Sequence, residues 1–555
     1  MIRDRFRRNS SLPERASALA PFRWPIFRRL WGATLVSNLG GLIQTVGAGW
    51  MMATIATSDD MVALVQASTT LPIMLFSLPA GALADTFDRR RIMLVAQSFM
   101  MAVSVLLALF AWQGWLDPWG LLAFTFLLGV GGALHNPSWQ ASMGDIVPRI
   151  DLPQAVSLNS MGFNLMRSVG PAIGGVIVAT LGAAAAFTAN AASYVALIVA
   201  LWLWKPEPRP RVAREPFGTA ILAGLRYVSM SPNLVKVMGR GALFGFAAIA
   251  GLALLPLVAR DLLAGGAFTY GLALGCYGLG AILGALANSR VRERLSNEAI
   301  VRSSFVIFAV AAVVMALSTQ IWITAIALLL AGASWVLSLS LFNVSVQLAT
   351  PRWVVGRALA LYQTATFGGM ALGAWCWGLI AEHHGVSEAL LGAAAVLAAG
   401  ALIGLRYGLP AFATVDLDPS GRFSEPLIKL DLRQRSVPLM ITIDFVIPQG
   451  KVDQFLAAMA DRRRIRLRDG ARNWTLMRDL EQPELWTESY HVPTWADYVR
   501  HNQRRTKADV DVSERLLALH EGPEPPRVHR MIERQTVPLR DDMPLRPARM
   551  PDIQG

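Results

Sequence analysis

Long apolar stretches follow one another along most of this chain, and they restrict its fold more than any other feature. The runs lie near residues 30–55, 62–84, 92–112, 118–142, 155–181, 184–204, 235–258, 267–288, 297–317, 321–345, 358–381 and 387–407. Each is close to the roughly 20 apolar residues that a helix needs to cross a bilayer. The chain is 54% hydrophobic and only 16% charged. We therefore expect an all-α polytopic membrane protein with twelve transmembrane helices.

A charged stretch recurs 203 residues further along the chain. Residues 81–91 (Gly-Ala-Leu-Ala-Asp-Thr-Phe-Asp-Arg-Arg-Arg) and 284–294 (Gly-Ala-Leu-Ala-Asn-Ser-Arg-Val-Arg-Glu-Arg) are identical at six of eleven positions. Other identities follow the same offset: Pro148 with Pro351, Gly170 with Gly373, and Gly175 with Gly378. A charged loop repeated between membrane spans is typical of a duplicated transporter. The repeat predicts two six-helix halves, residues 27–204 and 234–409.

Basic residues are concentrated in alternate loops. After the arginine-rich tail at 1–26, they occur at Arg89–Arg91, Arg149, Lys205–Arg226, Arg290–Arg294, Arg352 and Arg357. The other loops are short and nearly free of cations, with Arg260 as the exception. The positive-inside rule then places both termini in the cytoplasm, as an even number of spans requires. This distribution accounts for the net charge of +13, so we expect no nucleic acid as a partner. No cleaved signal peptide is expected.

Three polar segments frame the membrane part and a further domain. Residues 205–233 read as a cytoplasmic linker with an amphipathic helix, 410–436 as a second linker, and 536–555 as a disordered tail. Between the last two, residues 437–535 alternate strand and helix patterns, with a long helix expected from Trp495 to about His520. The order is that of a ferredoxin-like α+β domain in the cytoplasm, for which pairing with a second copy into a homodimer is expected.

Two motifs resemble the major facilitator superfamily over roughly residues 20–410. Gly81, Asp85, Arg89 and Arg90 match its loop motif between spans two and three, although Asp88 stands where a glycine is usual. Residues 167–175 (Arg-Ser-Val-Gly-Pro-Ala-Ile-Gly-Gly) resemble the span-five motif of its exporters. The stretches 145–149 and 155–159 are similar to the enterobactin-exporter-like branch, also called transmembrane secretion effectors. The C-terminal domain resembles the antibiotic-biosynthesis-monooxygenase type of dimeric α/β barrel.

The resemblance implies a gating role for a charge cluster at the cytoplasmic mouth. Its members are Gly81, Asp85, Asp88, Arg89, Arg90, Asp145 and Arg149. Asp85 can face the positive N-terminus of a helix in the other half, and Arg89 can pair with Asp145. The alternative is a solvated turn that only obeys the charge rule.

The span-five motif comprises Gly170, Pro171, Gly174 and Gly175. These residues should thin and bend the helix so that a neighbour packs closely. The resemblance implies that this packing closes the transport path, whereas the alternative is helix packing alone.

Arg167 lies near the expected bilayer midplane, where an arginine is costly without a partner or a wet cavity. No Asp or Glu lies at comparable depth. Arg167 either attracts an anionic or polar substrate group or is held by backbone carbonyls and polar neighbours. The full set of candidate cavity residues is Arg167, Asn38, Gln44, His135, Asn159, Asn164 and Gln363. His135 is either a proton-coupling group or, as is more common, a packed neutral histidine.

These features favour a secondary active exporter of a small siderophore-like, drug-like or otherwise amphipathic molecule, working by alternating access. Proton coupling follows from the resemblance only, and no ATP-binding loop is present. We expect no catalysis, cofactor or metal. The expected partners are the substrate and membrane lipids, including an anionic leaflet beside a basic helix with arginines at 462, 463, 464, 466 and 468. The alternative is a membrane-anchored enzyme or metabolite sensor whose C-terminal domain carries the activity.

Overall fold

A computed structural model describes residues 19–148, 150–205, 217–351, 353–409 and 438–532, and in between 417, 420–421, 423–426 and 428. The side chain of Asp85, all of Arg149 and Arg352, residues 206–216 of the first predicted linker, most of the second linker, residues 1–18 of the predicted N-terminal tail, and the predicted tail at 536–555 lie outside this description. Two compact units make up the chain. The transmembrane unit comprises Met1–Arg214, Lys236–Ser345 and Leu359–Ala411; the C-terminal unit comprises Glu215–Val235, Val346–Ala358 and Phe412–Gly555.

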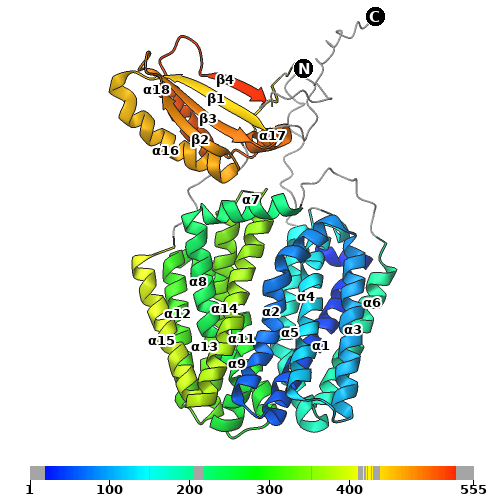
Figure 1. Ribbon diagram of the computed structural model, residues 1–555. Coiled ribbons are helices and arrows are strands. Elements are labelled where there is room, and N and C mark those ends of the chain that lie inside the picture. Colours follow the sequence, from blue (N-terminus) through cyan, green and yellow to red (C-terminus); the bar gives the residue numbers. More distant parts are fainter. Residues whose placement is uncertain are drawn as a thin grey trace, which may run out of the picture. The chain divides into compact units, whose positions relative to one another are not determined.

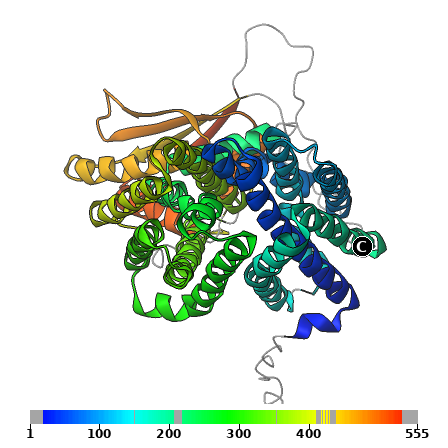
Figure 2. The same ribbon diagram turned by 90° about the horizontal axis from the view of Figure 1, so that it is seen from below.

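The first half of the transmembrane unit is a bundle of six long helices. They are α1 (Pro25–Ile55), α2 (Asp59–Thr86), α3 (Arg89–Trp112), α4 (Pro118–Ile146), α5 (Leu152–Leu181) and α6 (Ala183–Leu203), after a short 3-10 turn at Ala20–Arg23. We call this group the N-bundle. Figure 1 shows it in blue to teal, and Figure 2 shows it grouped apart from the green-to-yellow helices.

The second half repeats this arrangement with one interrupted helix, and we call it the C-bundle. Its first span consists of α8 (Pro232–Ala248), α9 (Ala250–Ala253), α10 (Leu255–Leu257) and a π turn, η2 (Val258–Leu262). The other five are α11 (Ala267–Arg294), α12 (Asn297–Leu317), α13 (Ile321–Leu348), α14 (Val355–His384) and α15 (Val386–Arg406). Pro256 lies in the interrupted part and has no amide hydrogen to give to the helical ladder.

Eleven helical stretches within the described residues are long and apolar enough to cross a membrane. The interrupted span at Pro232–Leu262 counts as one of them, and α1, although 31 residues long, is not among them. Arginines near its start and polar side chains such as Asn38 and Gln44 reduce the apolar character of α1. The prediction of a polytopic, mostly helical membrane protein is confirmed.

The repeat found in the sequence reappears in the helix ends. Shifting both ends of α5 and of α6 by 203 residues gives the ends of α14 and α15. Gly182 follows α5 with φ of 82°, and Gly385 follows α14 with φ of 105°. Both glycines adopt backbone conformations that L side chains rarely reach, so the same tight turn recurs in each half.

The repeated charged stretch, however, is not the same structural element in both halves. In the N-bundle, Asp88 caps α3 by accepting a hydrogen bond from the Arg90 amide at 2.9 Å, and the turn falls there. The residue 203 positions later is Val291, which cannot cap a helix. α11 therefore runs on to Arg294, and Ser296 caps α12 by accepting from the Ala299 amide at 3.2 Å. The predicted charged loop is therefore shorter than expected in the N-bundle, where only residues 87–88 lie outside helices, and the prediction is wrong for 284–294, which is helical throughout.

The C-terminal unit contains a four-stranded antiparallel sheet with helices on one face (Figure 1). Its elements are β1 (Leu439–Val446), a short 3-10 turn (Gln449–Lys451), α16 (Val452–Asp469), β2 (Arg472–Arg478), β3 (Leu485–Val492), α17 (Trp495–Gln503), α18 (Lys507–Leu519) and β4 (Arg527–Ile532). The strand order is β2-β3-β1-β4. Alternate β1 residues, such as Ile441 and Ile443, pack on Phe455 of α16 and Leu516 of α18.

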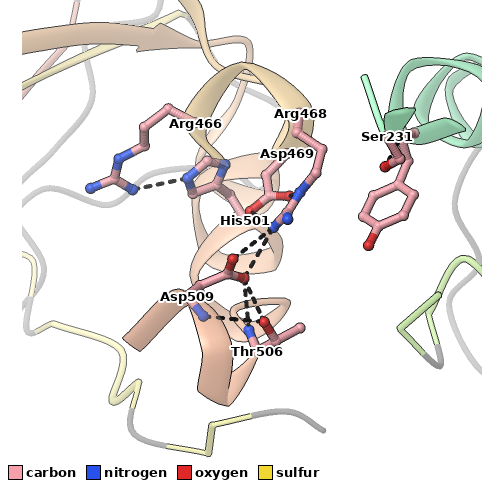
Figure 3. Close-up of polar contacts among 8 residues, drawn as sticks. Ser231, Arg466, Arg468, Asp469, His501, Thr506 and Asp509 are labelled. Carbon is pink, nitrogen blue, oxygen red and sulfur yellow. Dashed lines mark hydrogen bonds and ion pairs between the residues drawn. The ribbon is translucent and has the colours of Figure 1, made fainter. Parts of the chain in front are cut away.

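The long helix expected from Trp495 to about His520 is two helices instead. The first helix ends at Gln503, and Thr506 caps the start of the second, because its hydroxyl accepts from the Asp509 amide while the Asp509 carboxylate accepts from the Thr506 amide (Figure 3). This reciprocal capping box makes a new helix start more favourable than continuation.

The short helix α7 (Phe217–Ser229) also belongs to the C-terminal unit, and its formation confirms the helix expected in the linker. The Arg468 guanidinium of α16 lies 5.2 Å from the centre of the Tyr227 ring. Arg504 lies 4.1 Å from the ring centre of Trp353, which itself contacts Tyr227 edge to face. Cation–π contacts thus join the sheet domain to α7 and to the segment around Trp353.

Candidate functional site

The N-bundle and C-bundle meet where α5 crosses α11, and glycines permit the close approach. A Cβ atom added to Gly175 would lie 2.9 Å from the Gly271 Cα, and one added to Gly278 would clash with the backbone at Arg167. On another side of α5, a Cβ on Gly170 or Gly174 would crowd α1. The prediction that the span-five glycines allow a neighbour to pack closely is confirmed for two neighbours. Its consequence for transport stays a prediction.

Arg167 lies midway along the 30 residues of α5, beside this crossing. Its guanidinium carbon is 5.6 Å from the ring centre of Tyr277 on α11, so the arginine of one half stacks on an aromatic ring of the other. Tyr277 is buried, and its hydroxyl has no hydrogen-bond partner among the described residues. Arg167 is only half-buried, so this cation–π contact is worth between about 0.5 and 2 kcal/mol, which offsets part of the cost of an arginine at this depth.

Gln44 has a different setting from Arg167. Its side-chain oxygen accepts hydrogen bonds from Ser104 on α3, at 3.2 Å, and from Asn190 on α6. Asn190 in turn contacts the hydroxyl of Tyr194 at 3.2 Å. This network joins three helices of the N-bundle, so the described contacts give Gln44 a helix-bridging role.

The remaining cavity candidates do not form one cluster by their contacts. Asn159 accepts a hydrogen bond from the Trp139 indole at 3.0 Å, and His135 stacks on the same Trp139 with ring centres 6.4 Å apart. The Asn164 amide donates to the Ser160 carbonyl of its own helix at 2.9 Å. Asn38 and Gln363 are half-buried. The buried, stacked position of His135 fits the reading as a packed histidine.

The charge cluster of the loop motif ties helices of the N-bundle together. The Arg89 guanidinium is 3.4 Å from the Asp145 carboxylate, which confirms the expected pairing, and it also donates to the Ala141 carbonyl on α4. Arg90 donates to the carbonyls of Leu201 and Trp202, both at 2.8 Å, at the end of α6. A cation at a helix C-terminus is favourable, because the carbonyls there carry partial negative charge.

Arg260, noted in the sequence only as an exception to the charge rule, bridges the two bundles. From η2 of the C-bundle it donates to the Ala53 carbonyl of α1 at 2.8 Å and to the Asp59 carboxylate of α2 at 2.9 Å. It also pairs with its neighbour Asp261. The sequence signal was present: a lone cation in an otherwise cation-poor set of loops.

A second missed group is a buried ion pair in the C-bundle. Arg240 on α8, 5% exposed, lies 3.4 Å from Glu298, the second residue of α12. Glu298 also accepts a hydrogen bond from the Leu409 amide at 2.9 Å, and Arg240 stacks on the Phe305 ring at 5.2 Å. An arginine inside a membrane span usually has such a partner, and here the carboxylate comes from the very start of the next helix.

The arginine-rich helix of the C-terminal unit also differs from expectation. The prediction of one solvated basic face is wrong for Arg462 and Arg466 of α16, because both are buried and share the fully buried Glu488 of β3, at 2.7 and 3.3 Å. Burial alone would raise the pKa of Glu488, but the two guanidinium charges lower it to about 2. The helical spacing could have revealed this, since 462 and 466 continue the apolar stripe of Phe455 and Met459.

A family model described as "Transmembrane secretion effector" matches residues 16–536. The match is longer than the region of 20–410 on which the sequence motifs are found, and it includes the C-terminal sheet. Because it covers most of the chain, it applies to the two bundles and the added domain together.

Several related proteins are transporters. The chain is 30% identical over 236 residues to the staphyloferrin A transporter of Staphylococcus aureus, which is 38% of this chain and 59% of that protein, so less than two thirds of its length. It is 24% identical over 422 residues to the multidrug efflux pump Tap of Mycobacterium tuberculosis, covering 73% of this chain and 98% of the pump. These relatives point to a transporter rather than an enzyme.

Solved structures share the fold of the bundles. An auto-inhibited peptide transporter of the POT family aligns with a TM-score of 0.56 and 15% identity, over 71% of this chain and 99% of that chain. An inward-facing bacterial homologue of the human lysosomal transporter Spinster aligns with a TM-score of 0.52 and 14% identity, over 69% of this chain and 94% of that chain.

Proposed function

Since this chain belongs to the transmembrane secretion effector family, we propose that it exports a small amphipathic molecule across the cytoplasmic membrane by alternating access. The observation that carries the proposal is the α5–α11 crossing, where Arg167 of one bundle stacks on Tyr277 of the other at mid-depth. Substrate sites of such transporters lie near the bilayer midplane between the two repeats. A substrate with a carboxylate or another strongly polar group would compete with Tyr277 for the Arg167 guanidinium.

The topology belongs to the same proposal. We count α1 as a span, which gives twelve and puts both termini in the cytoplasm, in agreement with the distribution of basic loops. The C-terminal sheet then lies in the cytoplasm. Its strand order and its alternation of strands with helices support a ferredoxin-like class.

Two charged contacts are assigned to the conformational cycle. In this topology Arg260 lies on the outer side, where its bonds to Ala53 and Asp59 hold the bundles closed while the path is open inward. On the inner side, the loop-motif residues around Arg89 stabilise the opposite state, with Asp85 directed at a helix N-terminus of the C-bundle. Rocking between the two states exposes the Arg167 region to each side in turn.

The energy source and the assembly complete the proposal. A proton gradient drives export, as the resemblance implies, and the relatives named for staphyloferrin A transport and for multidrug efflux support an amphipathic substrate. A second copy pairs through the open sheet face, which carries polar side chains such as Thr487, bonded to Asp444, and Thr475, bonded to Ser489. Light scattering of the purified chain, with the detergent contribution subtracted, checks this pairing.

Retention of metabolites and drugs in cells with and without the protein tests export. Arg167→Ala should reduce the export rate by about tenfold or more, because one charge-assisted contact is worth about 1.5–3 kcal/mol. Arg294→Ala, at the exposed end of α11, is the matched control at equal membrane level. Normal export by Arg167→Ala would contradict the proposed site, and export that survives collapse of the proton gradient would contradict the coupling.

The outer contact has a separate test. Arg260→Ala should favour the state that is open outward, and this is measured as faster labelling, from outside the cell, of a cysteine placed at the α5–α11 crossing. Asp261→Ala is the matched control, because it removes only the neighbouring carboxylate. Unchanged labelling in Arg260→Ala would contradict the assignment.

A further inference from the structure

Arginines of the C-terminal unit surround a small pocket between α16 and α18. Arg462 and Arg466 of α16 and Arg505, just before α18, line it together with Ile465, Asp509, Val512 and Ser513. The pocket has room for about one water-sized sphere, so only the tip of a larger group could enter it. Three guanidinium groups at one small pocket are unusual in a domain of this size, because each carries a charge that burial penalises.

The carboxylates next to the pocket are already engaged. Both oxygens of Glu488 are in use, one by Arg462 and the other by Arg466 and the Trp474 indole at 3.0 Å. Asp509 accepts from Arg468, at 3.0 and 3.2 Å, and from the amide and hydroxyl of Thr506 (Figure 3). Neither carboxylate is available for a further cation.

Arg505 therefore has no carboxylate in direct contact among the described residues, and Glu488, which Arg462 and Arg466 already share, only partly offsets the repulsion at Arg505. No hydrogen bond or ion pair joins its guanidinium to any described residue, although it is only partly exposed. Burial, with the positive charges of Arg466 and Arg462, lowers the pKa of Arg505 to about 10. The group still carries its charge at neutral pH, and a nearby anion would relieve the repulsion.

His501 adds a fixed polar wall on the far side of Arg466. Its ring nitrogen Nε2 lies 2.9 Å from Arg466 Nη1, which can only donate, so His501 accepts and stays neutral (Figure 3). Burial and the charge of Arg466 lower the pKa of His501 well below its usual value, in agreement with this geometry. The histidine orients Arg466 but adds no charge of either sign.

We propose that this pocket is a binding site for an oxyanion, the carboxylate or phosphate group of a small molecule, with Arg505 and Arg462 as direct donors. Guanidinium groups recognise both anions with paired hydrogen bonds. Ser513, whose hydroxyl makes only long contacts of 3.4 Å to Arg462 and to the Asp509 carbonyl, is a third donor at the mouth. The site is separate from the transport path and gives the added domain a ligand of its own.

Hydrogen–deuterium exchange of the full chain in detergent tests the site, with inorganic phosphate and citrate as probes and chloride at matched ionic strength as reference. Either probe should slow exchange in residues 452–469 and 507–519. Protection by phosphate alone assigns a phosphate ligand, and protection by citrate alone assigns a carboxylate.

Arg505→Ala should raise the half-saturating anion concentration at least about tenfold. Without anion it should exchange no faster than the parent, because Arg505 has no ion pair to lose. Arg505→Lys should keep part of the response, and Arg464→Ala, an exposed arginine on α16, should keep all of it. Absence of protection by both probes, or equal protection in the parent and Arg505→Ala, would overturn the proposal.

Discussion

The N-bundle and the C-bundle repeat the same helix packing but differ in charge at one equivalent contact. This contact joins the start of α3 to the end of α6 in the N-bundle, and the start of α12 to the end of α15 in the C-bundle. In the N-bundle, Arg90, the second residue of α3, donates to the carbonyls at the end of α6. In the C-bundle, Glu298, the second residue of α12, lies against the end of α15, where Gly404 leaves it room. A cation suits a helix C-terminus and an anion does not, so Glu298 requires the buried Arg240 beside it. The helices are thus repeated in the two halves, whereas the charged residues that stabilise this contact are not.

The largest expected effect comes from removing the compensating cation. Arg240→Met leaves Glu298 partly buried without its partner, and the cost can reach the about 3–5 kcal/mol of breaking a fully buried pair. We expect a clearly lower midpoint of thermal unfolding in detergent. The double variant Arg240→Met/Glu298→Gln should recover much of the loss. If the single variant unfolds at the parent's temperature, the two contacts do not differ as described.

The N-bundle contact should respond less. Arg90→Ala removes hydrogen bonds from a charged donor, worth about 1.5–3 kcal/mol at most, and solvent can replace part of them. Arg90→Glu should be worse than Arg90→Ala, because it puts an anion at the end of α6 without a companion cation. Thermal unfolding measures both variants, and equal midpoints for Ala and Glu would show that the helix end is not the cause.

The shared turns should respond equally in both halves. Gly182→Ala and Gly385→Ala each force a side chain into an extended conformation with positive φ, which only glycine adopts readily and which costs about 1–3 kcal/mol. The rate of hydrogen–deuterium exchange at the amides that flank each turn should rise by a similar factor in the two halves. An effect in one half only would mean that the repeat is not structurally equivalent at this position.

The smallest effects on stability are expected at the helix caps that place the turns differently near the two charged segments, 81–91 and 284–294. Asp88→Ala and Ser296→Ala should each cost about 1 kcal/mol. Val291→Asp offers α12 an alternative start at the repeat position. If local exchange shows that α11 now ends near residue 290, then the cap alone decides where the turn falls. If α11 still runs to Arg294, packing of that helix decides instead.

Much of the fold could be predicted from the sequence because its signals are local. Run length and hydrophobicity gave the helices of both bundles to within a few residues, and the 203-residue offset anticipated the matching ends of α5 and α14. Glycines at 170, 174 and 175 predicted close packing, because a missing side chain has the same effect whichever helix approaches.

The site was less predictable because it depends on partners distant in sequence. The ion pairs of Arg260 with Asp59 and of Arg240 with Glu298 form only when the helices pack. Gln44 is a polar residue in an apolar span, as expected for a cavity lining, but Ser104 and Asn190 form hydrogen bonds with it inside the N-bundle. The side chain of Asp85, central to the motif, lies outside the described part, so its role stays a prediction.

By itself the sequence determined that this chain is a duplicated membrane protein with an added α+β domain, because apolar runs and strand alternation are properties of neighbouring residues. Only the tertiary structure decided which charges are solvated and which are buried. Arg462 and Arg466 look like a surface patch in the sequence, yet they lie inside the domain on Glu488. An ion pair forms where packing brings opposite charges together and excludes water, and the chain order does not record that distance.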